Sequence, residues 1–191
     1  MLNKKTMSAA MLLTGLLLST QTMAQMYVGG TVGQARWETS CSQASFCDTY
    51  DTAFSVVGGY NINNQWGAEV GYTTFGTIHA SSYTATGLVA GSVKGSAIEM
   101  TGVYRRPLID KMTGFIKLGV GYNKAELNGT IGPVSANQTT RSTKPMIAIG
   151  ANYALTDTVS ARVEISSRRL DLMNNASTII NNFQIGLQRS F

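Results

Sequence analysis

FQIGLQRSF, residues 183–191, ends the chain and decides its fold. Its apolar residues fall on one parity and its polar residues on the other: Phe183, Ile185, Leu187 and Phe191 against Gln184, Gly186, Gln188 and Ser190. Side chains on a β-strand point to opposite faces in turn, so this segment is predicted to be a strand with one apolar face. Such a strand suits a closed β-barrel in an outer membrane, where it pairs with the first strand and leaves no edge toward lipid.

Residues 1–24 have the pattern of a secretory signal peptide. Lys4 and Lys5 precede a mostly apolar stretch at residues 11–18, and Thr22-Met23-Ala24 offers small residues at the two positions that a signal peptidase reads. The apolar stretch is too short for a membrane anchor, which needs roughly 18 or more apolar residues. We therefore expect cleavage after Ala24 and a single barrel domain at residues 25–191.

The charge of the mature chain is low. Removal of Lys4 and Lys5 lowers the formal net charge from +5 to +3 (5 − 2). No cluster of lysine and arginine is interleaved with stacking aromatic residues, which argues against a nucleic-acid partner. No stretch after Ala24 is apolar for long enough to form a membrane helix, so any passage through a bilayer must use strands. No cofactor is expected, and a monomer is predicted.

Period-two alternation recurs in eight segments, at about 26–37, 52–61, 66–75, 96–106, 114–125, 144–154, 159–168 and 178–191. The connections alternate between three short turns (61–65, 106–113 and 154–158) and four longer polar loops (38–51, 76–95, 126–143 and 169–177). Short periplasmic turns and long external loops are typical of outer-membrane barrels. The sequence therefore predicts an all-β fold, an eight-stranded antiparallel up-and-down transmembrane β-barrel.

The parity within each strand separates a lipid face from a lumen face. The segment 159–168 places Val159, Ala161, Val163 and Ile165 opposite Ser160, Arg162, Glu164 and Ser166. Glycines are frequent on the polar faces and bulky residues on the apolar faces, which favours apolar residues outside and polar residues inside. Four aromatic residues beside the short turns would form an interfacial girdle: Tyr60, Trp66, Tyr104 and Tyr153.

Three charged residues on the lumen parity should lie at one height near the periplasmic end: Glu69, Lys117 and Arg162. Charges inside a narrow barrel must be paired, so we predict a lumen ion-pair network centred on Glu69 and Arg162. Lys117, Glu164, Glu99 and Arg105 are expected around that centre. The network either fills and polarises the lumen or acts as the gate of a narrow, low-conductance pore.

Seven basic residues fall near the outer strand ends or in adjacent loops: Arg36, Lys94, Lys124, Arg141, Lys144, Arg168 and Arg169. Such a collar could contact the phosphates of lipopolysaccharide. Glu38, Glu126 and Asp171 share this region, so a solvated surface of mixed sign is the alternative.

Cys41 and Cys47 are predicted to form a disulfide, because a close pair in a polar loop of an exported protein is normally oxidised. The bond should contribute roughly 2 kcal/mol in the chain-entropy model. A metal site is the rival reading, but two thiolates with no histidine nearby do not complete a tetrahedral site. No metal site is therefore predicted.

Catalysis is the hypothesis from a different class, because a lipid-active enzyme of the outer membrane would need a positioned base. His79 is the only histidine and has no carboxylate near it in sequence. It could meet Asp48 or Asp171 in space. Because His79 has no orienting partner in the sequence, an exposed loop residue without a catalytic role is the favoured interpretation. No catalytic residue is therefore predicted.

Several motifs resemble the OmpA-like transmembrane domain family. The most specific run is similar to the second hairpin of that domain: Gly58-Gly59-Tyr60, Asn63, Gly67-Ala68-Glu69-Val70-Gly71-Tyr72 and Gly76. Further similarity covers the segments 107–111, 117–119, 153–157, 162–164 and 186–191. The resemblance implies an outer-membrane barrel, a lumen ion pair between Glu69 and Arg162, and assembly by recognition of the last strand.

That resemblance makes Phe183, Ile185, Leu187 and Phe191 the predicted assembly signal, read by the barrel-assembly machinery. Three positions depart from the family pattern: Thr101 and Asn152 replace expected charged residues, and Arg189 replaces an expected aromatic residue. Outer-membrane lipid and lipopolysaccharide are the other expected partners. The predicted role is structural or adhesion-like, through external loops that could bind a host or surface ligand. A narrow pore and a lipid-active enzyme are the alternatives.

Overall fold

The computed structural model describes residues 25–39, 45–84, 87–131, 134–172 and 176–191. The predicted signal peptide, residues 1–24, and Cys41 lie outside the described residues. Among the residues that are described, no helix is long and apolar enough to cross a membrane.

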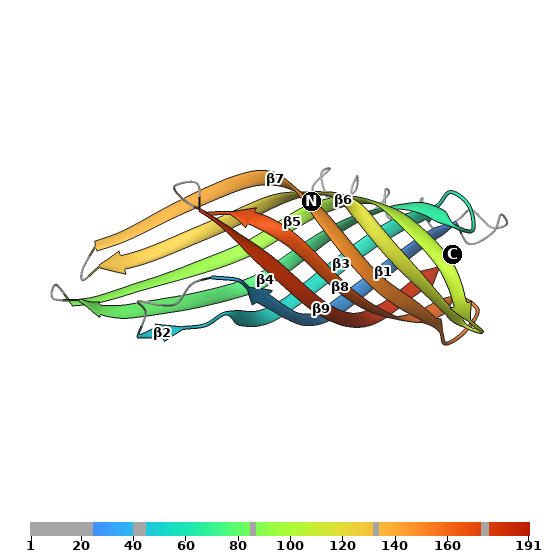
Figure 1. Cartoon of the computed structure of the whole chain (residues 1–191), viewed down its shortest axis with the longest axis horizontal. Helices are drawn as coiled ribbons and strands as arrows, with labels where there is room; N and C mark the ends of the chain where they lie inside the picture. The colour runs from blue at the N-terminus through green and yellow to red at the C-terminus, as the bar shows by residue number, and fades with distance from the viewer. Residues whose placement is uncertain (1–24, 40–44, 85–86, 132–133, 173–175) are drawn as a thin grey trace, which may run out of the picture.

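Eight long strands form a closed antiparallel ring (Figure 1). They are β1 (Met26–Trp37), β3 (Tyr50–Asn61), β4 (Trp66–Thr84), β5 (Gly87–Ile109), β6 (Met112–Ile131), β7 (Val134–Ala154), β8 (Val159–Asp171) and β9 (Ser177–Ser190). Each pairs with the next along the chain, and β9 pairs back with β1. A two-residue strand, β2 (Phe46–Cys47), adds to β4 outside the ring. The predicted all-β, eight-stranded antiparallel barrel is confirmed.

The seam between β1 and β9 closes the ring. Its register runs from Tyr27 opposite Ser190 to Trp37 opposite Ile180. At the end of the seam the Phe191 backbone N–H donates to the Met26 carbonyl over 2.9 Å. The Phe191 ring lies on the outside, with the guanidinium carbon of Arg189 5.3 Å from its centroid.

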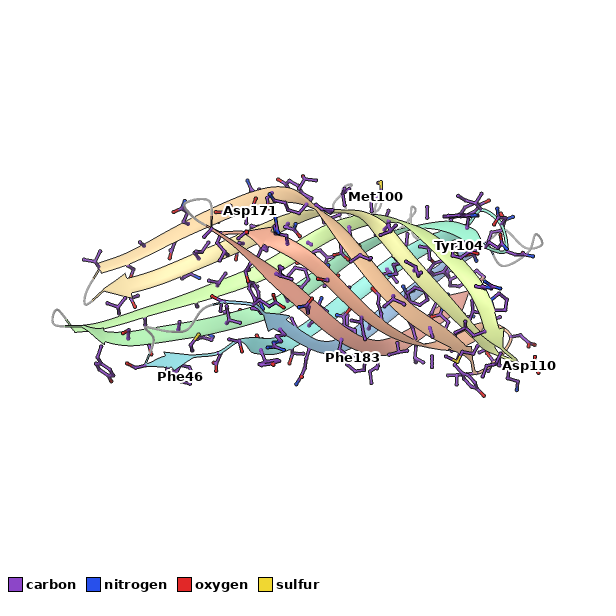
Figure 2. All side chains as sticks on the ribbon, in the orientation of Figure 1. Phe46, Met100, Tyr104, Asp110, Asp171 and Phe183 are labelled. Carbon is purple, nitrogen blue, oxygen red and sulfur yellow. The ribbon has the colours of Figure 1, made fainter. Side chains whose placement is uncertain are left out.

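The two faces of the strands are occupied as their parity predicts. On β6 the outward residues Ile116, Leu118, Val120 and Tyr122 are exposed, whereas Phe115 and Lys117 are buried inside. Met100 of β5 and Phe183 of β9 are likewise outside, and Figure 2 shows both on the body of the barrel. A soluble protein would have to hide this belt of apolar side chains, but lipid covers it in a membrane.

Trp66 and Tyr104 mark the short-turn end of the barrel, where their rings lie 4.9 Å apart between centroids. Figure 2 shows Tyr104 and Asp110 toward this same end of the barrel. The segment 106–113 was predicted to be a turn, but β5 continues to Ile109 and β6 starts at Met112. A reversal this tight needs a left-handed residue, and Lys111 supplies it with φ of 63°.

Two of the predicted external loops are in fact β-hairpins. Most of 76–95 belongs to β4 and β5, which stay paired up to Thr84 opposite Gly87. Most of 126–143 belongs to β6 and β7, which stay paired up to Ile131 opposite Val134. The composition of these segments is polar and poor in bulky residues, so their alternation is weak although their backbones pair fully.

A β-bulge at Gly76 allows β4 to continue past the point where its alternation was expected to end. The register against β5 shifts between Thr74 and Thr77, and Gly76 has φ of 72°. The extra residue reverses the parity, so Phe75 below the bulge and Ile78 above it both face inward. Asp51 lies against Gly76 and accepts a hydrogen bond from the Thr77 backbone N–H.

The ring opens at Pro145. Among the described residues, β7 and β8 are paired only from Met146, opposite Arg168, toward the short turns, whereas β6 and β7 remain paired far above this level. Proline has no N–H to donate to the next rung, which would lie opposite Arg169. Above Pro145 the wall continues only as an open sheet, here called the protruding sheet: residues 77–84, 87–95, 125–131 and 134–145 with β2.

The protruding sheet extends well beyond the rest of the barrel (Figure 1). In Figure 2 the end of β8, marked by Asp171, stops well short of the tips of β4 to β7 along the long axis of the molecule. Phe46 of β2 lies beside the extension. From Ala125 to Ile131 the sheet rises by roughly 20 Å along β6, at about 3.4 Å per residue. This is the part of the chain that stands clear of the lipid belt.

Candidate functional site

The charged layer of the lumen lies in the half of the barrel near the short turns. It consists of Glu69 of β4, Lys117 of β6, and Arg162 and Glu164 of β8. Arg162 Nη2 lies 3.0 Å from Glu69 Oε2 and 2.8 Å from Glu164 Oε2. Lys117 Nζ contacts Glu69 and lies 2.7 Å from Glu164 Oε2. Each carboxylate therefore touches both cations, and the two charges of each sign balance.

Neighbouring side chains complete this layer. The Tyr27 hydroxyl donates to Glu69 Oε2 over 2.9 Å, and Arg162 Nη1 donates to Gln188 Oε1 over 2.9 Å. Arg162 also lies over the Phe115 ring, 4.6 Å from its centroid. Buried charges are tolerated when partners satisfy them in this way.

Arg105 joins the layer indirectly. Its Nη2 donates to the Tyr27 hydroxyl, which in turn donates to Glu69. The Arg105 side chain is only partly buried, toward the short-turn end. Of the six residues predicted for the network, the structure therefore brings together five: Glu69, Lys117, Arg105, Arg162 and Glu164.

Glu99 belongs to a second ion pair, higher in the lumen. It contacts Arg168 of β8, whose guanidinium also donates to Ser166 over 2.6 Å and lies 4.8 Å from the centroid of Phe75. The prediction that Arg168 lies on the outer collar is wrong, because the residue is 4% exposed and faces the lumen. The parity of β8 requires this, since Arg168 shares a face with Glu164 and Ser166.

Uncharged polar residues connect the two ion-pair layers. The Ser55 hydroxyl lies 2.9 Å from Thr73 Oγ1 and 3.0 Å from Gln184 Oε1, and its single proton can be donated to either oxygen. Thr73 donates to Glu99 over 3.2 Å, and Thr31 donates to Gln184 over 3.3 Å. The middle of the lumen is thus filled by hydrogen-bonded side chains.

An apolar cluster, here called the apolar plug, lies in the lumen above the second ion pair. Its core consists of Trp37, Phe75, Leu170, Ile180 and Ile78, with four alanines, Ala35, Ala53, Ala97 and Ala125. Trp37, Phe75, Leu170 and Ile180 are at most 1% exposed. The Trp37 ring and the Phe75 ring occupy the space beside Gly95, where a Cβ would overlap them. Packed apolar side chains at this level disfavour water inside the lumen.

Five of the predicted collar residues do point outward above the apolar belt: Arg36, Lys94, Lys124, Arg141 and Arg169. Lys124 lies opposite Arg141 across the β6–β7 ladder and Lys94 lies opposite Glu126 across the β5–β6 ladder. Lys124 forms an ion pair with Glu126, and its hydrogen bond lowers the pKa of that carboxyl. The guanidinium carbon of Arg36 lies 5.6 Å from the centroid of Tyr50.

Lys144, the remaining collar residue, has a different place. Its Nζ lies 2.8 Å from Asp171 Oδ2, which joins β7 to the end of β8 just above the split at Pro145. Both side chains are about one-third exposed (31% and 29%). This ion pair holds the base of the protruding sheet against the barrel rim.

A trough of about 400 Å³ lies on the concave side of the protruding sheet. Ile78, Val93 and Leu127 lie at its apolar floor, and Thr39 and Asp48 line one side. Gly129 leaves open space in it, because a Cβ there would meet nothing within 4 Å. Cys47 also lines the trough, but its predicted partner Cys41 is not among the described residues, so the disulfide stays a prediction.

His79 lies on the protruding sheet. The register places it opposite Ser92, and its carbonyl accepts a hydrogen bond of 2.8 Å from the Asp48 backbone N–H. The three residues thus form a row across adjacent strands, but no side-chain hydrogen bond among the described residues connects them. Asp171 is instead paired with Lys144. Within the described ranges, no three His, Cys, Asp or Glu residues gather in a way that could hold a metal ion.

Sequence reasoning missed the apolar plug and the roles of Tyr27 and Gln188. Except for Ile78, which follows the bulge at Gly76, these residues lie on the lumen parity of their strands, and that parity was a usable signal. Trp37 and Phe75 lie at the predicted strand ends. An aromatic residue is also expected there at the membrane interface, so the sequence did not distinguish the two positions.

A closed ring of eight transmembrane strands with an apolar belt, a polar interior and aromatic residues at the short-turn end defines an integral β-barrel protein of the cell outer membrane. The chain belongs to the OmpA-like transmembrane domain family, whose model matches residues 21–181. Comparison with curated protein sequences gives no match.

Several solved outer-membrane barrels share the fold. Neisserial surface protein A superposes with a TM-score of 0.59 at 19% identity, covering 87% of this chain and 97% of that protein. Ail of Yersinia pestis, solved with the heparin analogue sucrose octasulfate, gives 0.53 at 16% identity, covering 87% and 99%. OprG of Pseudomonas aeruginosa gives 0.52 at 12% identity, covering 88% and 96%. At these identities the similarity shows the fold alone.

Proposed function

We propose that this protein is a sealed outer-membrane barrel that holds the protruding sheet outside the cell as a binding surface. The observation that carries the proposal is the contrast between the two halves of the molecule. The lumen contains two ion-pair layers and an apolar plug, whereas four strands continue past the rim as an open sheet. A rigid scaffold that presents extended segments is the usual arrangement for recognition.

The similarity to Ail supports an adhesion-type role. That protein carries the name attachment invasion locus protein and was solved with a heparin analogue bound. The ligand of Ail is not carried over to this chain. The shared architecture supports only the broader idea that external segments of such a barrel bind other molecules.

A trimmed variant tests the adhesion role. Residues 128–137 are replaced by Asn-Gly, so that the pair Leu127 and Gln138 flanks a two-residue turn. We expect the variant to keep the heat-modifiable migration of a folded barrel while cells that display it lose adhesion to host cells and to immobilised matrix proteins. Folded, displayed variant with unchanged adhesion would contradict the proposal.

The two alternatives have their own tests. A pore requires discrete conductance events in planar bilayers, with a difference between wild type and Glu69→Gln. The plug of Trp37 and Phe75 argues for none. A lipid-active enzyme requires hydrolase activity that disappears in His79→Ala, and the absence of side-chain hydrogen bonds between His79 and Asp48 argues against it.

The outward basic residues are proposed to contact lipopolysaccharide. Arg141 and Lys124 lie side by side directly above the apolar belt, so a phosphate there would relieve the repulsion between like charges on paired strands. We expect Arg141→Gln with Lys124→Gln to weaken co-purification with lipopolysaccharide. Equal retention by the wild type and the double variant would contradict this contact.

A further inference from the structure

The outer edge of β7 is an unpaired strand edge at the cell surface. We propose that residues 134–145 of this edge bind an extended acidic peptide as an additional β-strand; this inference rests on the proposed function and names the class of its partner. Strand addition requires backbone N–H and C=O groups on the edge that are not already hydrogen-bonded within the sheet.

The ladder between β6 and β7 determines which backbone groups of β7 are already hydrogen-bonded. The Ala154 backbone N–H donates to the Lys111 carbonyl over 2.8 Å, which makes this a directly hydrogen-bonded pair. The register then runs without a shift up to Ile131 opposite Val134. Hydrogen-bonded pairs recur at every second residue, so even-numbered residues of β7 turn their backbone groups toward β6.

The odd-numbered residues of β7 therefore turn their N–H and C=O groups away from β6. Below the split these groups meet β8. Above it they are those of Ser135, Asn137, Thr139, Arg141 and Thr143. Pro145 fits the same assignment, because a residue without an N–H is tolerated where that group would not be needed for the β6 ladder. Among the described residues, no β8 residue is paired with β7 above Met146.

The opposite edge of the protruding sheet is covered. On β4 the Ser81 and His79 carbonyls accept hydrogen bonds from the Ser45 and Asp48 backbone N–H groups, over 2.9 Å and 2.8 Å. Asp51 accepts from the Thr77 N–H. Exposed edges are normally protected against unwanted pairing, and residues 45–51 do this for β4. For β7 the described residues provide no equivalent cover.

The positive charge of the β7 edge favours an acidic peptide as its partner. Arg141 and Lys144 are the only charged residues between positions 134 and 145, and Lys124 lies opposite Arg141 on β6. Lys144 is neutralised by Asp171, whereas Arg141 is exposed and has no ion pair among the described residues. A second copy of this edge would bring Arg141 toward another cationic edge, so self-pairing is disfavoured and an acidic strand is favoured.

The pleat specifies the peptide further. Its residues opposite Arg141 and the other odd positions would lie on the convex face, where acidic side chains gain a cationic neighbour. Its alternate residues would lie on the concave side beside the trough floored by Val93 and Leu127, where apolar side chains gain cover. An extended segment that alternates acidic and apolar residues fits both faces.

The test uses the full-length protein folded in phosphatidylcholine nanodiscs and a fluorescent nine-residue probe that alternates glutamate or threonine with valine. Thr139→Pro with Thr143→Pro removes two outward N–H donors without touching the β6 ladder. The matched control, Thr139→Val with Thr143→Val, keeps both donors. We expect about a tenfold loss of affinity in the proline variant, from two lost hydrogen bonds, and little change in the valine variant.

Two further measurements test the backbone hydrogen bonds with a modified probe and the charge preference with a variant of Arg141. A probe N-methylated at alternate residues should bind at least about tenfold more weakly to the wild type. Arg141→Glu should prefer a lysine probe over the glutamate probe. Equal binding to the proline and valine variants, or no binding of the acidic probe to the wild type, would overturn the inference.

Cell adhesion separates this inference from the proposed function. Loss of adhesion in the trimmed variant together with full adhesion in the proline variant would overturn strand addition and leave the surface role standing. Full adhesion in both variants would overturn the proposed function itself. Loss in both, with adhesion by the valine variant, supports the two proposals together.

Discussion

Replacing Glu69 with glutamine should destabilise the barrel by roughly 3–5 kcal/mol, the range for removing one partner from a buried ion pair. Glu69 is 3% exposed and accepts from Arg162, Lys117 and Tyr27. Glutamine fills the same space without the charge. Lys117 and Arg162 would then share the single carboxylate of Glu164 in an environment that cannot hydrate the surplus cation.

A second substitution tests the cause. In Glu69→Gln with Lys117→Met the lumen is again neutral, and the contact of 2.8 Å between Arg162 and Glu164 remains. We expect the double variant to be more stable than Glu69→Gln alone, with a coupling energy of about 1–3 kcal/mol between the two sites. Steric or packing defects alone would instead make the double variant the least stable protein of the series.

Urea unfolding of the barrel in phosphatidylcholine vesicles provides the free energies, followed by tryptophan fluorescence and by heat-modifiable migration. Trp37 reports the buried plug and Trp66 the lipid interface. Glu126→Gln is the matched control, because Glu126 pairs with Lys124 in an exposed position and should leave the midpoint unchanged. A loss below about 1 kcal/mol in Glu69→Gln, the size of an ordinary substitution, would refute the reasoning.

Three more outcomes are expected. Deletion of Phe191 should lower the yield of assembled barrel, measured by heat-modifiable migration, whereas Arg189→Tyr is tolerated; normal yield without Phe191 would count against the assembly signal. Gly76→Val should destabilise by about 1–2 kcal/mol in the urea assay, because φ of 72° is costly for a residue with a Cβ, and no loss would contradict the bulge. Cys41 and Cys47 should react with a maleimide only after reduction; labelling without reductant would argue against the disulfide.

The membrane-embedded part of the fold was predictable because one face of every strand meets lipid. That constraint enforces alternation strictly, and the parity of residues such as Ile116 and Lys117 could be read directly. The pairing of Glu69 with Arg162 followed from the same parity and from equal distance to the short turns. Both features depend on local pattern, which a sequence displays.

The protruding sheet was not predictable in the same way. Both of its faces lie outside lipid, so small and polar residues such as Ala80, Gly91 and Gly129 are tolerated and the alternation fades. The position of Arg168 failed for a different reason. Its strand was predicted to end at Arg168, and an arginine at a strand end is also typical of an interfacial contact. Only the packing of the lumen side chains shows that Arg168 is buried.

The split at Pro145 divides the chain into parts that can change independently. Below it every strand has two neighbours, and a substitution must fit a closed ring and a filled lumen. Beyond the Lys144–Asp171 ion pair at its base, the β6–β7 hairpin can lengthen, shorten or be exchanged in pairs of residues, because no described rung of the β7–β8 ladder must change with it. One imino acid thus allows the cell surface of this protein to diversify while the membrane-embedded ring stays constant, and it makes the hairpin a natural insertion point for displayed sequences.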